Sequence, residues 1–379
     1  MKVFVIGNSN SFWFKYYLET IVLPRYDDVS IFVESEKEQQ FLDFYKQNNV
    51  HVFSVNHYNK LILKLPKIRS IYMRRRKIKS ISGKFDLVIV LSCRIYDMMI
   101  ALAIKKKNGK VVSIFTGSDI LKNNHRSDVK LNKLLTKCDS TICASAENPA
   151  NKVRQLPYVK QKGCTVIPFG LVTLSMIDKY RDNNLDAFKK EFLIPVGKTI
   201  VCVGYNARSE QQHIKVIESL KNLPDEFKKQ IAIILPLTYL REETYLNVLK
   251  TFLASTEFNS VTLDKFMNQE DMAKLWLSCD VFINSQTCDA MSASVIEALH
   301  AGVEVVSGSW LKYPELEKIG VHIDQFDNFA DLPNLIEQAI KKHKNKDSKI
   351  AKQGYNTSLD DYRKSWNEIY DKVDSLLEK

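Results

Sequence analysis

The sequence predicts an α/β protein with two doubly wound domains, each built around a parallel sheet. Short strand-like runs rich in Val, Ile and Phe alternate with amphipathic helical runs along the chain. Strands separated by helical crossovers pair in parallel and are covered on both faces. A length of 379 residues suits two domains of about 150–200 residues each. In such folds the ligand lies at the carboxyl ends of the strands, so the expected site is a cleft between the domains.

The expected elements follow one another in order. In the first half we expect strands over residues 3–7, 29–34, 50–55, 85–92, 110–117, 140–145 and 164–170, with helices between most of them, for example over 10–23, 37–48 and 96–107. In the second half we expect strands over 199–204, 230–237, 259–264, 279–285 and 303–309. These series predict a first domain over 1–172, a linker over 173–198, a second domain over 199–360 and a C-terminal helix over 361–379.

The C-terminal helix has a single apolar face, made by Tyr362, Trp366, Ile369, Val373 and Leu376. This spacing is typical of an amphipathic helix that packs on a larger unit. The helix could therefore cross back to the first domain.

Cysteine usage and hydropathy indicate a cytoplasmic protein. Seven cysteines are scattered without a C-x-x-C pair, which is typical of free thiols in a reducing compartment. The start, MKVFVIGN, is interpreted as a first strand and not as a signal peptide. No stretch approaches the roughly 20 apolar residues of a membrane span.

Basic residues are concentrated in the first half. Residues 1–172 contain 29 Lys and Arg against 13 Asp and Glu, whereas the remainder contains 26 against 31. Residues 60–84 contain ten basic and no acidic residues, among them Lys67, Arg69, Arg74, Arg75, Arg76, Lys77 and Lys79. The apolar residues between them, at roughly helical spacing, are Leu61, Ile62, Leu65, Ile68, Ile71 and Tyr72. The pattern favours an anionic membrane surface. A solvated helical face is the alternative, and no recognised motif supports nucleic acid.

The stretch 203–220, VGYNARSEQQHIKVIESL, predicts a phosphate-binding turn. A strand ends at Gly204, and Ser209 with Gln212 forms a capping-box pattern at the start of a helix. Free N–H groups at a helix N-terminus favour an anion, and Arg208 adds a positive charge there. The alternative is an ordinary capped helix.

The stretch 288–302, CDAMSASVIEALHAG, combines two carboxylates with a helix start. Ser292 or Ser294 can cap the helix, and Gly302 can end it. Asp289 then lies just before the helix and Glu297 about one turn inside it. Both carboxylates accept hydrogen bonds from hydroxyls, which sugar rings offer. The alternatives are a loop or cap role for Asp289 and a solvated helix position for Glu297.

These stretches resemble the family-4 glycosyltransferases of GT-B architecture. The spacing D-x7-E followed by ALHAG is similar to the family's E-x7-E signature, and SIFTGSDI is similar to its His-Gly-x-Asp segment. TVIPFGL is similar to the strand end before its linker, and the resemblance extends over nearly the whole chain. The loop GYNARSEQQH is similar to loops of transferases that handle deoxy-amino sugars in surface polysaccharide synthesis. The resemblance implies two Rossmann-like domains facing each other across a cleft.

The resemblance also implies roles for individual residues. Glu297 would hold the donor ribose and Asp289 would contact the donor sugar. The other implied donor-side residues are Gly204, Asn206, Arg208, His213, Lys215, Phe266, Met267, Ala290, Met291, Ser292 and Ala293. The implied acceptor-side residues are Gly7, Asn8, Ser9 and Gly117, with Thr116 near the transferred sugar. His213 could meet either a ligand phosphate or solvent.

We therefore expect a cytoplasmic glycosyltransferase, peripheral on the inner face of the membrane, that moves a hexose or deoxy-amino sugar from a nucleotide-diphosphate donor to a glycan or lipid-linked acceptor. The resemblance implies a retaining reaction without metal or cofactor, and Asp-x-Asp is absent from the sequence. A second hypothesis is an inverting transferase or an epimerase on the same fold, with Asp119 as the candidate general base. A third is a binding or chaperone subunit that has lost catalysis, because Thr116 and Tyr205 replace a His and an Arg of the family.

Overall fold

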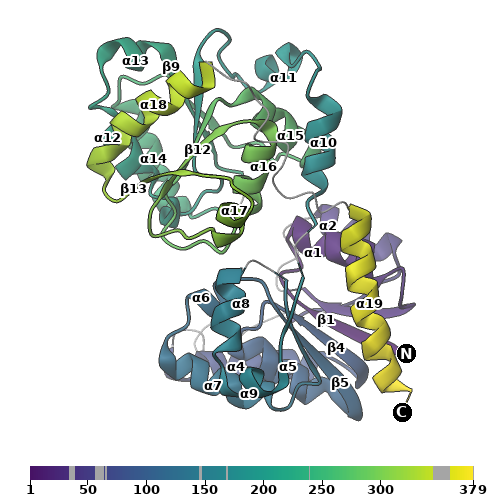
Figure 1. Ribbon diagram of the computed structural model, residues 1–379. Coiled ribbons are helices and arrows are strands. Elements are labelled where there is room, and N and C mark those ends of the chain that lie inside the picture. Colours follow the sequence, from purple (N-terminus) through teal and green to yellow (C-terminus); the bar gives the residue numbers. More distant parts are fainter. Residues whose placement is uncertain are drawn as a thin grey trace. The chain divides into compact units, whose positions relative to one another are not determined.

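The chain folds into two compact units (Figure 1). Met1–Phe169 and Leu359–Lys379 form the first unit, and Gly170–Ser358 form the second. The computed structural model describes residues 1–33, 39–55, 64, 66–144, 147–167, 170–238, 240–344 and 359–378, without the side chains of residues 40, 66, 67 and 118.

The first unit is built on a seven-stranded parallel sheet with the order β3-β2-β1-β4-β5-β6-β7. Its strands are β1 (Lys2–Ile6), β2 (Asp28–Phe32), β3 (His51–Phe53), β4 (Phe85–Leu91), β5 (Lys105–Phe115), β6 (Ser140–Cys143) and β7 (Thr165–Val166). The strand order reverses between β1 and β4, so the loops that follow these two strands flank the switch point.

Two apolar clusters cover the two faces of this sheet. One face carries α1 (Phe12–Tyr17), the π-helix η1 (Leu18–Val22), α2 (Gln39–Gln47) and the C-terminal α19 (Leu359–Leu377). The other carries α4 (Pro66–Ser80), α5 (Ile95–Ile104), α7 (His125–Leu135), α8 (Glu147–Arg154) and α9 (Pro157–Lys162), with the short α6 (Ser118–Leu121) beside α8.

The C-terminal helix α19 belongs to the first unit. Tyr362, Trp366, Tyr370 and Val373 are buried in the same cluster as η1 and β1. The Tyr17 and Tyr370 hydroxyls share a hydrogen bond. Arg25 Nε donates to Asp374 Oδ2 at 2.9 Å. Leu376, which we expected on the apolar face, is 44% exposed, and Leu377 packs there instead.

The second unit is built on a six-stranded parallel sheet with the order β10-β9-β8-β11-β12-β13. Its strands are β8 (Thr199–Val203), β9 (Ile231–Pro236), β10 (Ser260–Leu263), β11 (Val281–Asn284), β12 (Glu304–Gly308) and β13 (Asp324–Phe326). Here the order reverses between β8 and β11.

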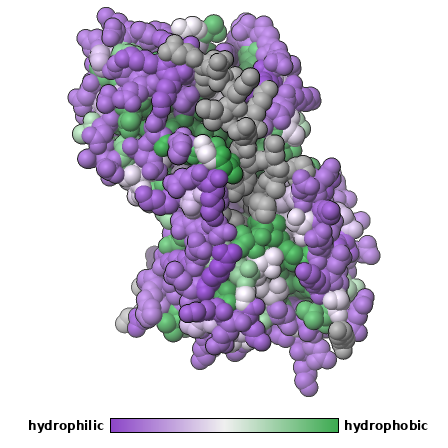
Figure 2. All heavy atoms as spheres, viewed as in Figure 1, coloured by the Kyte–Doolittle hydropathy of each residue, from purple (hydrophilic) through white to green (hydrophobic). Residues whose placement is uncertain are grey.

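Helices cover both faces of the second sheet. One face carries α10 (Val172–Tyr180), α11 (Asp186–Glu191), α15 (Gln269–Ser278), α16 (Ala293–Ala301) and α17 (Pro314–Lys318). The other carries α12 (His213–Leu220), α13 (Asp225–Gln230), α14 (Glu243–Ala254) and α18 (Leu332–Lys344). Two 3-10 turns in the described part of this unit are η2 (Ser209–Gln211) and η3 (Phe329–Asp331). Most of the surface drawn in Figure 2 is hydrophilic, with smaller apolar patches.

Two expectations about element placement differ from the structure. The stretch 173–198, expected as a linker, contains α10 and α11, and α10 packs on α15 and α16 within the second unit. Residues 105–107, expected in a helix, begin β5 instead. Strand pairing prevails there because Lys105 pairs with Phe85, and a Cβ on Gly109 would lie only 2.6 Å from the Phe85 carbonyl oxygen. Residues 34, 37–38, 145, 168–169, 345–358 and 379 of the expected elements lie outside the described residues.

Among the described residues, no helix is both long enough and apolar enough to span a bilayer.

Candidate functional site

The second unit places two loops together at its switch point, where ligands bind in doubly wound sheets. These are the loop after β8, which begins at Gly204, and the loop after β11, which begins at Ser285. Gly204 has φ +66°, and its N–H donates to the Ile283 carbonyl at 3.1 Å. A Cβ at this position would lie 2.7 Å from His213 Nε2. Only glycine fits this turn. The strand was expected to end at Gly204, and β8 ends at the preceding residue, Val203.

Glutamine side chains tie the two loops to each other. Gln211 Oε1 accepts from the Tyr205 N–H at 3.1 Å, and Gln211 Nε2 donates to Gln286 Oε1 at 2.6 Å. Gln212 Nε2 donates to the Ser285 carbonyl at 2.6 Å, and Ser285 Oγ donates to the Gln211 carbonyl at 2.7 Å. Because Gln211, Gln286 and Ser285 are buried, these bonds hold the rim of the site in one conformation.

The expected capping box at the start of α12 is absent. Gln212 precedes the helix in the left-handed conformation, with φ 57°, and makes no capping hydrogen bond. Ser209 starts the turn η2 instead, and its hydroxyl donates to Glu242 Oε2 at 2.8 Å. The local pattern predicts that Ser209 caps α12. Ser209 instead binds Glu242, which is distant in the sequence. Gln212 therefore supplies no side-chain cap, and the Tyr245 hydroxyl instead accepts from the N–H groups of His213 and Ile214 in the first turn of α12.

Two cations expected to face a diphosphate have partners within the second unit. Arg208 Nε donates to Glu242 Oε1 at 3.2 Å, and its Nη1 lies 3.4 Å from Glu210 Oε2. Lys215 Nζ donates to Gln212 Oε1 at 2.9 Å and lies 5.6 Å from the centre of the Phe329 ring. Asn206 is buried and accepts from the Arg208 N–H at 3.0 Å. In this conformation the charge of Arg208 is balanced by carboxylates.

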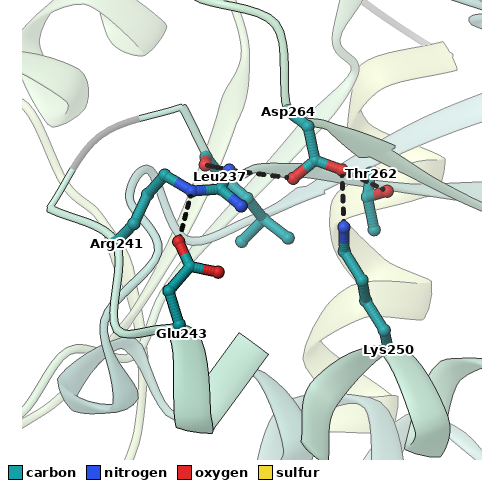
Figure 3. Close-up of polar contacts among 6 residues, drawn as sticks. All are labelled: Leu237, Arg241, Glu243, Lys250, Thr262 and Asp264. Carbon is teal, nitrogen blue, oxygen red and sulfur yellow. Dashed lines mark hydrogen bonds and ion pairs between the residues drawn. The ribbon is translucent and has the colours of Figure 1, made fainter. Parts of the chain in front are cut away.

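The loop after β9 is fixed by a network of ion pairs (Figure 3). Arg241 Nη1 donates to Asp264 Oδ1 at 3.2 Å and to the Leu237 carbonyl at 3.1 Å, and its Nε donates to Glu243 Oε1 at 3.0 Å. Lys250 Nζ donates to Asp264 Oδ2 at 2.9 Å. Hydrogen bonds from Lys250 and Arg241 outweigh partial burial and lower the pKa of Asp264. Asp264 therefore stays ionised at neutral pH and anchors the loop.

The segment after Asp264 contains both residues expected to contact the donor base. Phe266 is 41% exposed, whereas Met267 is buried in the apolar cluster with α15 and α16. An exposed ring can stack on a base, but the buried methionine supports the loop from beneath.

Asp289 lies in the loop after β11 and is held by four hydrogen bonds. Its Oδ2 accepts from the Tyr313 hydroxyl at 2.9 Å, from Asn284 Nδ2 at 3.2 Å and from the Ser292 N–H at 3.3 Å. Its Oδ1 accepts from the Ala290 N–H at 2.8 Å. Asp289 thus organises the loop that leads into α16.

The start and end of α16 agree with the sequence prediction. Ser292 caps the helix, since its Oγ accepts from the Val295 N–H at 3.3 Å, and Gly302 ends it with φ 89°. Met291, between Asp289 and this cap, has φ 137°, which a non-glycine residue rarely adopts. Such backbone strain persists only where the surroundings impose it. Ala293 is the first residue of the helix, so its N–H has no partner within the helix.

Glu297 is a buried carboxylate inside α16, and the solvated alternative is excluded. It is 6% exposed, and its Oε2 accepts from the Trp276 indole N–H at 2.9 Å. Burial raises its pKa, while hydrogen bonds from Thr173 and Trp276 act in the opposite direction. Sequence reasoning missed both partners, since α10 and α15 bring them to α16 from distant positions.

His213 is fully buried at the start of α12, so the solvent alternative does not hold. Its Nδ1 shares a hydrogen bond with the Tyr245 hydroxyl at 3.0 Å. Its Nε2, which lies beside Gly204, has no partner among the described residues. Burial lowers the pKa of His213 to about 4, so the imidazole is neutral at physiological pH.

The neutral His213 predicts a pH dependence of stability. Between about pH 6.5 and pH 4 the unfolded chain binds a proton at this position that the folded chain does not, so the free energy of unfolding falls as the pH falls. The loss amounts to about 3 kcal/mol across the window. Urea unfolding of the natural chain and of His213→Asn at several pH values measures it. The variant should show the shallower slope between pH 6.5 and 4, and equal slopes would refute the assignment.

In the first unit, Asp119 is buried and accepts hydrogen bonds from backbone N–H groups of two loops. Its Oδ2 accepts from the Cys93 N–H at 2.7 Å, and its Oδ1 accepts from the N–H groups of Thr116 at 3.1 Å and Gly117 at 2.8 Å. Burial raises its pKa, and these N–H groups oppose the shift. Thr116 Oγ1 shares a hydrogen bond with Ser92 Oγ at 2.8 Å. The carboxylate therefore joins the loops after β4 and β5.

The loop after β1 carries the other expected acceptor-side residues. A Cβ on Gly7 would lie 2.5 Å from the Phe14 ring, so a side chain there would displace α1. Asn8 Oδ1 accepts from the Asn10 N–H at 3.3 Å. Ser9 is buried, and its carbonyl accepts from the Tyr45 hydroxyl. All three lie at the switch point of the first sheet.

The basic helix α4 presents only part of the expected patch to solvent. Ile68, Arg69, Ile71, Arg75, Arg76 and Lys79 are exposed. Lys77 is buried instead, with its ammonium 4.7 Å from the centre of the Phe32 ring and 5.0 Å from that of Tyr96. Arg74 is half-buried, and its Nη1 lies 2.8 Å from Met99 Sδ. Lys77 and Arg74 turn inward because they lie on the side of α4 that packs on α5. Leu61, Ile62, Leu65 and the side chain of Lys67 lie outside the described residues.

Comparison with known proteins finds a family match within the second unit. Residues 185–357 match the family of glycosyl transferases group 1. These residues, somewhat under half of the chain, are therefore similar to glycosyl transferases group 1. The match spans β8 to α18 and includes Gly204, Asp289 and Glu297. No curated protein matches the sequence.

Solved structures show that the whole chain has the GT-B fold of glycosyltransferases. HepE of Anabaena, solved with UDP-glucose, has a TM-score of 0.67 at 16% identity, with 98% of this chain and 100% of that chain covered. A glycosyltransferase of Rickettsia africae has a TM-score of 0.65 at 16% identity and 98% coverage of both chains. The UDP-GlcNAc 2-epimerase of Neisseria meningitidis, bound to UDP-GlcNAc, has a TM-score of 0.59 at 14% identity, covering 98% of this chain and 100% of that chain.

Proposed function

We propose that this protein is a glycosyltransferase that moves a sugar from a nucleotide-diphosphate sugar to a glycan or lipid-linked acceptor in surface polysaccharide synthesis. The main support is the pair of carboxylates on either side of the α16 N-terminus, at the switch point of the second sheet. Glu297 is buried inside the helix and Asp289 is fixed just before it. The family match includes both residues.

The proposed donor extends along α16 and across the switch point. Glu297 accepts hydrogen bonds from the ribose, and Asp289 accepts one from the sugar. The diphosphate lies between them, where the first N–H groups of α16 favour negative charge. Phe266 is exposed at the neighbouring loop and can stack on the base.

We propose a retaining reaction that needs neither a metal ion nor a cofactor. The first N–H groups of α16 stabilise the leaving diphosphate, because fixed backbone dipoles can stabilise developing charge without a metal ion. Glu242→Gln removes the charge of one carboxylate that pairs with Arg208, and we expect this variant to bind diphosphate more strongly.

Turnover in excess EDTA tests directly the claim that the reaction needs no metal ion. A loss of activity that Mg²⁺ or Mn²⁺ restores would overturn it.

The inverting alternative depends on Asp119 as its general base. Asp119 is 9% exposed, and both of its carboxylate oxygens accept hydrogen bonds from backbone N–H groups. The lone pairs that a general base would use are therefore occupied in this conformation. A general base must reach the acceptor hydroxyl. We therefore favour the retaining reaction, and the anomeric configuration of the product tests it.

Thermal-shift measurements test donor binding. The panel contains UDP-glucose, UDP-N-acetylglucosamine, GDP-mannose and dTDP-rhamnose, together with UDP, GDP and dTDP. One base class should raise the unfolding temperature, because a ligand that binds only the folded state stabilises it. No shift with any member would contradict the proposal. A shift without transfer to any acceptor would support the binding-subunit alternative.

We further propose that α4 holds the protein on the anionic inner face of the membrane. Its exposed residues combine Ile68 and Ile71 with Arg75, Arg76 and Lys79. Their helical spacing places these five side chains on one side of α4. Exposed isoleucines beside cations are typical of interfacial helices.

Vesicle binding tests this surface. Changing Arg75, Arg76 and Lys79 together to Gln should weaken binding to phosphatidylglycerol vesicles about 100-fold at low salt, since each cation contributes about 1 kcal/mol. The matched control changes the exposed Lys229, Lys318 and Lys364 to Gln, which removes the same charge elsewhere. Equal losses in the two triple variants would show that only net charge matters.

A further inference from the structure

We propose that Tyr313 is a positioning residue that, together with Asn284, aims the carboxylate of Asp289 at the donor sugar. This inference rests on the proposed function of Asp289 as the sugar contact. Tyr313 lies in the loop after β12, and Asn284 is the last residue of β11. Two neighbouring strands of the sheet therefore bring these side chains to Asp289.

Three polar atoms form a closed triangle at this point. Asn284 Nδ2 lies 2.8 Å from the Tyr313 hydroxyl oxygen and 3.2 Å from Asp289 Oδ2, and the Tyr313 oxygen lies 2.9 Å from the same Oδ2. The tyrosine hydroxyl accepts from the amide and donates to the carboxylate. Rotating the Asp289 side chain would break both bonds at once, so the carboxylate plane is fixed.

Burial makes this arrangement rigid. Asn284 is fully buried and Tyr313 is 3% exposed, with its ring in the apolar cluster of the second unit. Burial, and next the charge of Asp289, hold the pKa of Tyr313 well above its usual value, so the hydroxyl keeps its proton and donates. A hydrogen bond to a charged acceptor is stronger than one between neutral groups.

The orientation of Asn284 indicates that the triangle has a function. Its amide N–H group points at Tyr313 and Asp289, while its Oδ1 has no donor among the described residues. A buried acceptor without a partner costs free energy, and such groups are rare in native proteins. Simple packing would not require this orientation, whereas aiming a carboxylate does.

The experiment compares the nucleotide sugar that gives the largest shift in the thermal panel with its own nucleoside diphosphate. Dissociation constants are measured by calorimetry for the natural chain, Tyr313→Phe, Asp289→Asn and the double variant. We expect Tyr313→Phe to weaken binding of the nucleotide sugar about tenfold and that of the diphosphate less than about twofold. The double variant should lose no more than Asp289→Asn alone, because the hydroxyl acts through the carboxylate.

Two further variants keep the outcome interpretable. Tyr370→Phe removes a buried hydroxyl from the first unit and should leave both constants unchanged. Asn284→Ser removes the amide from the other corner and should act in the same direction as Tyr313→Phe. Equal weakening of sugar and diphosphate, additive losses in the double variant, or no loss at all would overturn the inference. If the natural chain binds no panel member, the proposed function falls first, and the role of Tyr313 falls with it.

Discussion

Replacing Asp289 with alanine is expected to reduce sugar transfer about 100-fold or more, while the affinity for the nucleoside diphosphate changes less than about threefold. The reason is that the proposed contact of Asp289 lies at the sugar, where charge develops in the transition state. Steady-state turnover and calorimetry with the diphosphate measure the two effects separately. A variant that transfers sugar at the natural rate would exclude Asp289 from the site.

Replacing Glu297 with alanine is expected to have the opposite effect, a loss of nucleotide affinity. Here the affinity for the nucleotide should fall about 100-fold, because the ribose loses its hydrogen-bond acceptor. Glu297→Gln keeps an acceptor for the Trp276 N–H and separates the loss of charge from the loss of packing. The assignment of the two carboxylates would be reversed if Glu297→Ala lowered turnover at unchanged nucleotide affinity.

Replacing Trp366 with alanine is expected to lower the free energy of unfolding of the first unit by about 3–5 kcal/mol. Trp366 is fully buried, and its ring lies against those of Tyr17, Tyr362 and Tyr370 at centroid distances of 5.3, 5.8 and 6.2 Å. Removing the indole ring leaves a cavity and removes three aromatic contacts. Urea unfolding followed by circular dichroism measures the change.

Leu376→Ala is the control for Trp366→Ala, since it lies on the same helix but is 44% exposed. It should cost less than about 1 kcal/mol. Similar losses in both variants would show that α19 contributes by its helicity and not by docking. The two units could unfold separately, so each transition is fitted by itself.

The fold was predictable because its signals are local. Each buried strand of a parallel sheet is a short apolar run, and β4, β8, β9 and β11 each fall within such a run in the sequence. Caps are equally local, and Ser292 and Gly302 bound α16 as expected. The start of β5 was not predicted, because the three lysines at 105–107 are typical of an exposed helix. This segment is a strand because it pairs with β4.

The candidate site was predictable in its location but not in its partners. A sequence pattern places Asp289 before a helix and Glu297 within it, since both lie in one continuous stretch. It cannot show that Tyr313 or Trp276 will meet them, because other elements bring those side chains in. For the same reason the pattern did not reveal that Glu242 pairs with Arg208, or that Lys77 turns inward.

The central claim is that the donor binds the second unit at the loops after β8 and β11. Hydrogen–deuterium exchange with the stabilising nucleotide sugar from the panel tests it most directly. We predict slower exchange in peptides covering residues 203–213 and 284–297, and much less of this protection in Glu297→Ala at the same ligand concentration. Protection confined to other segments, or equal protection in the variant, would contradict this placement of the donor.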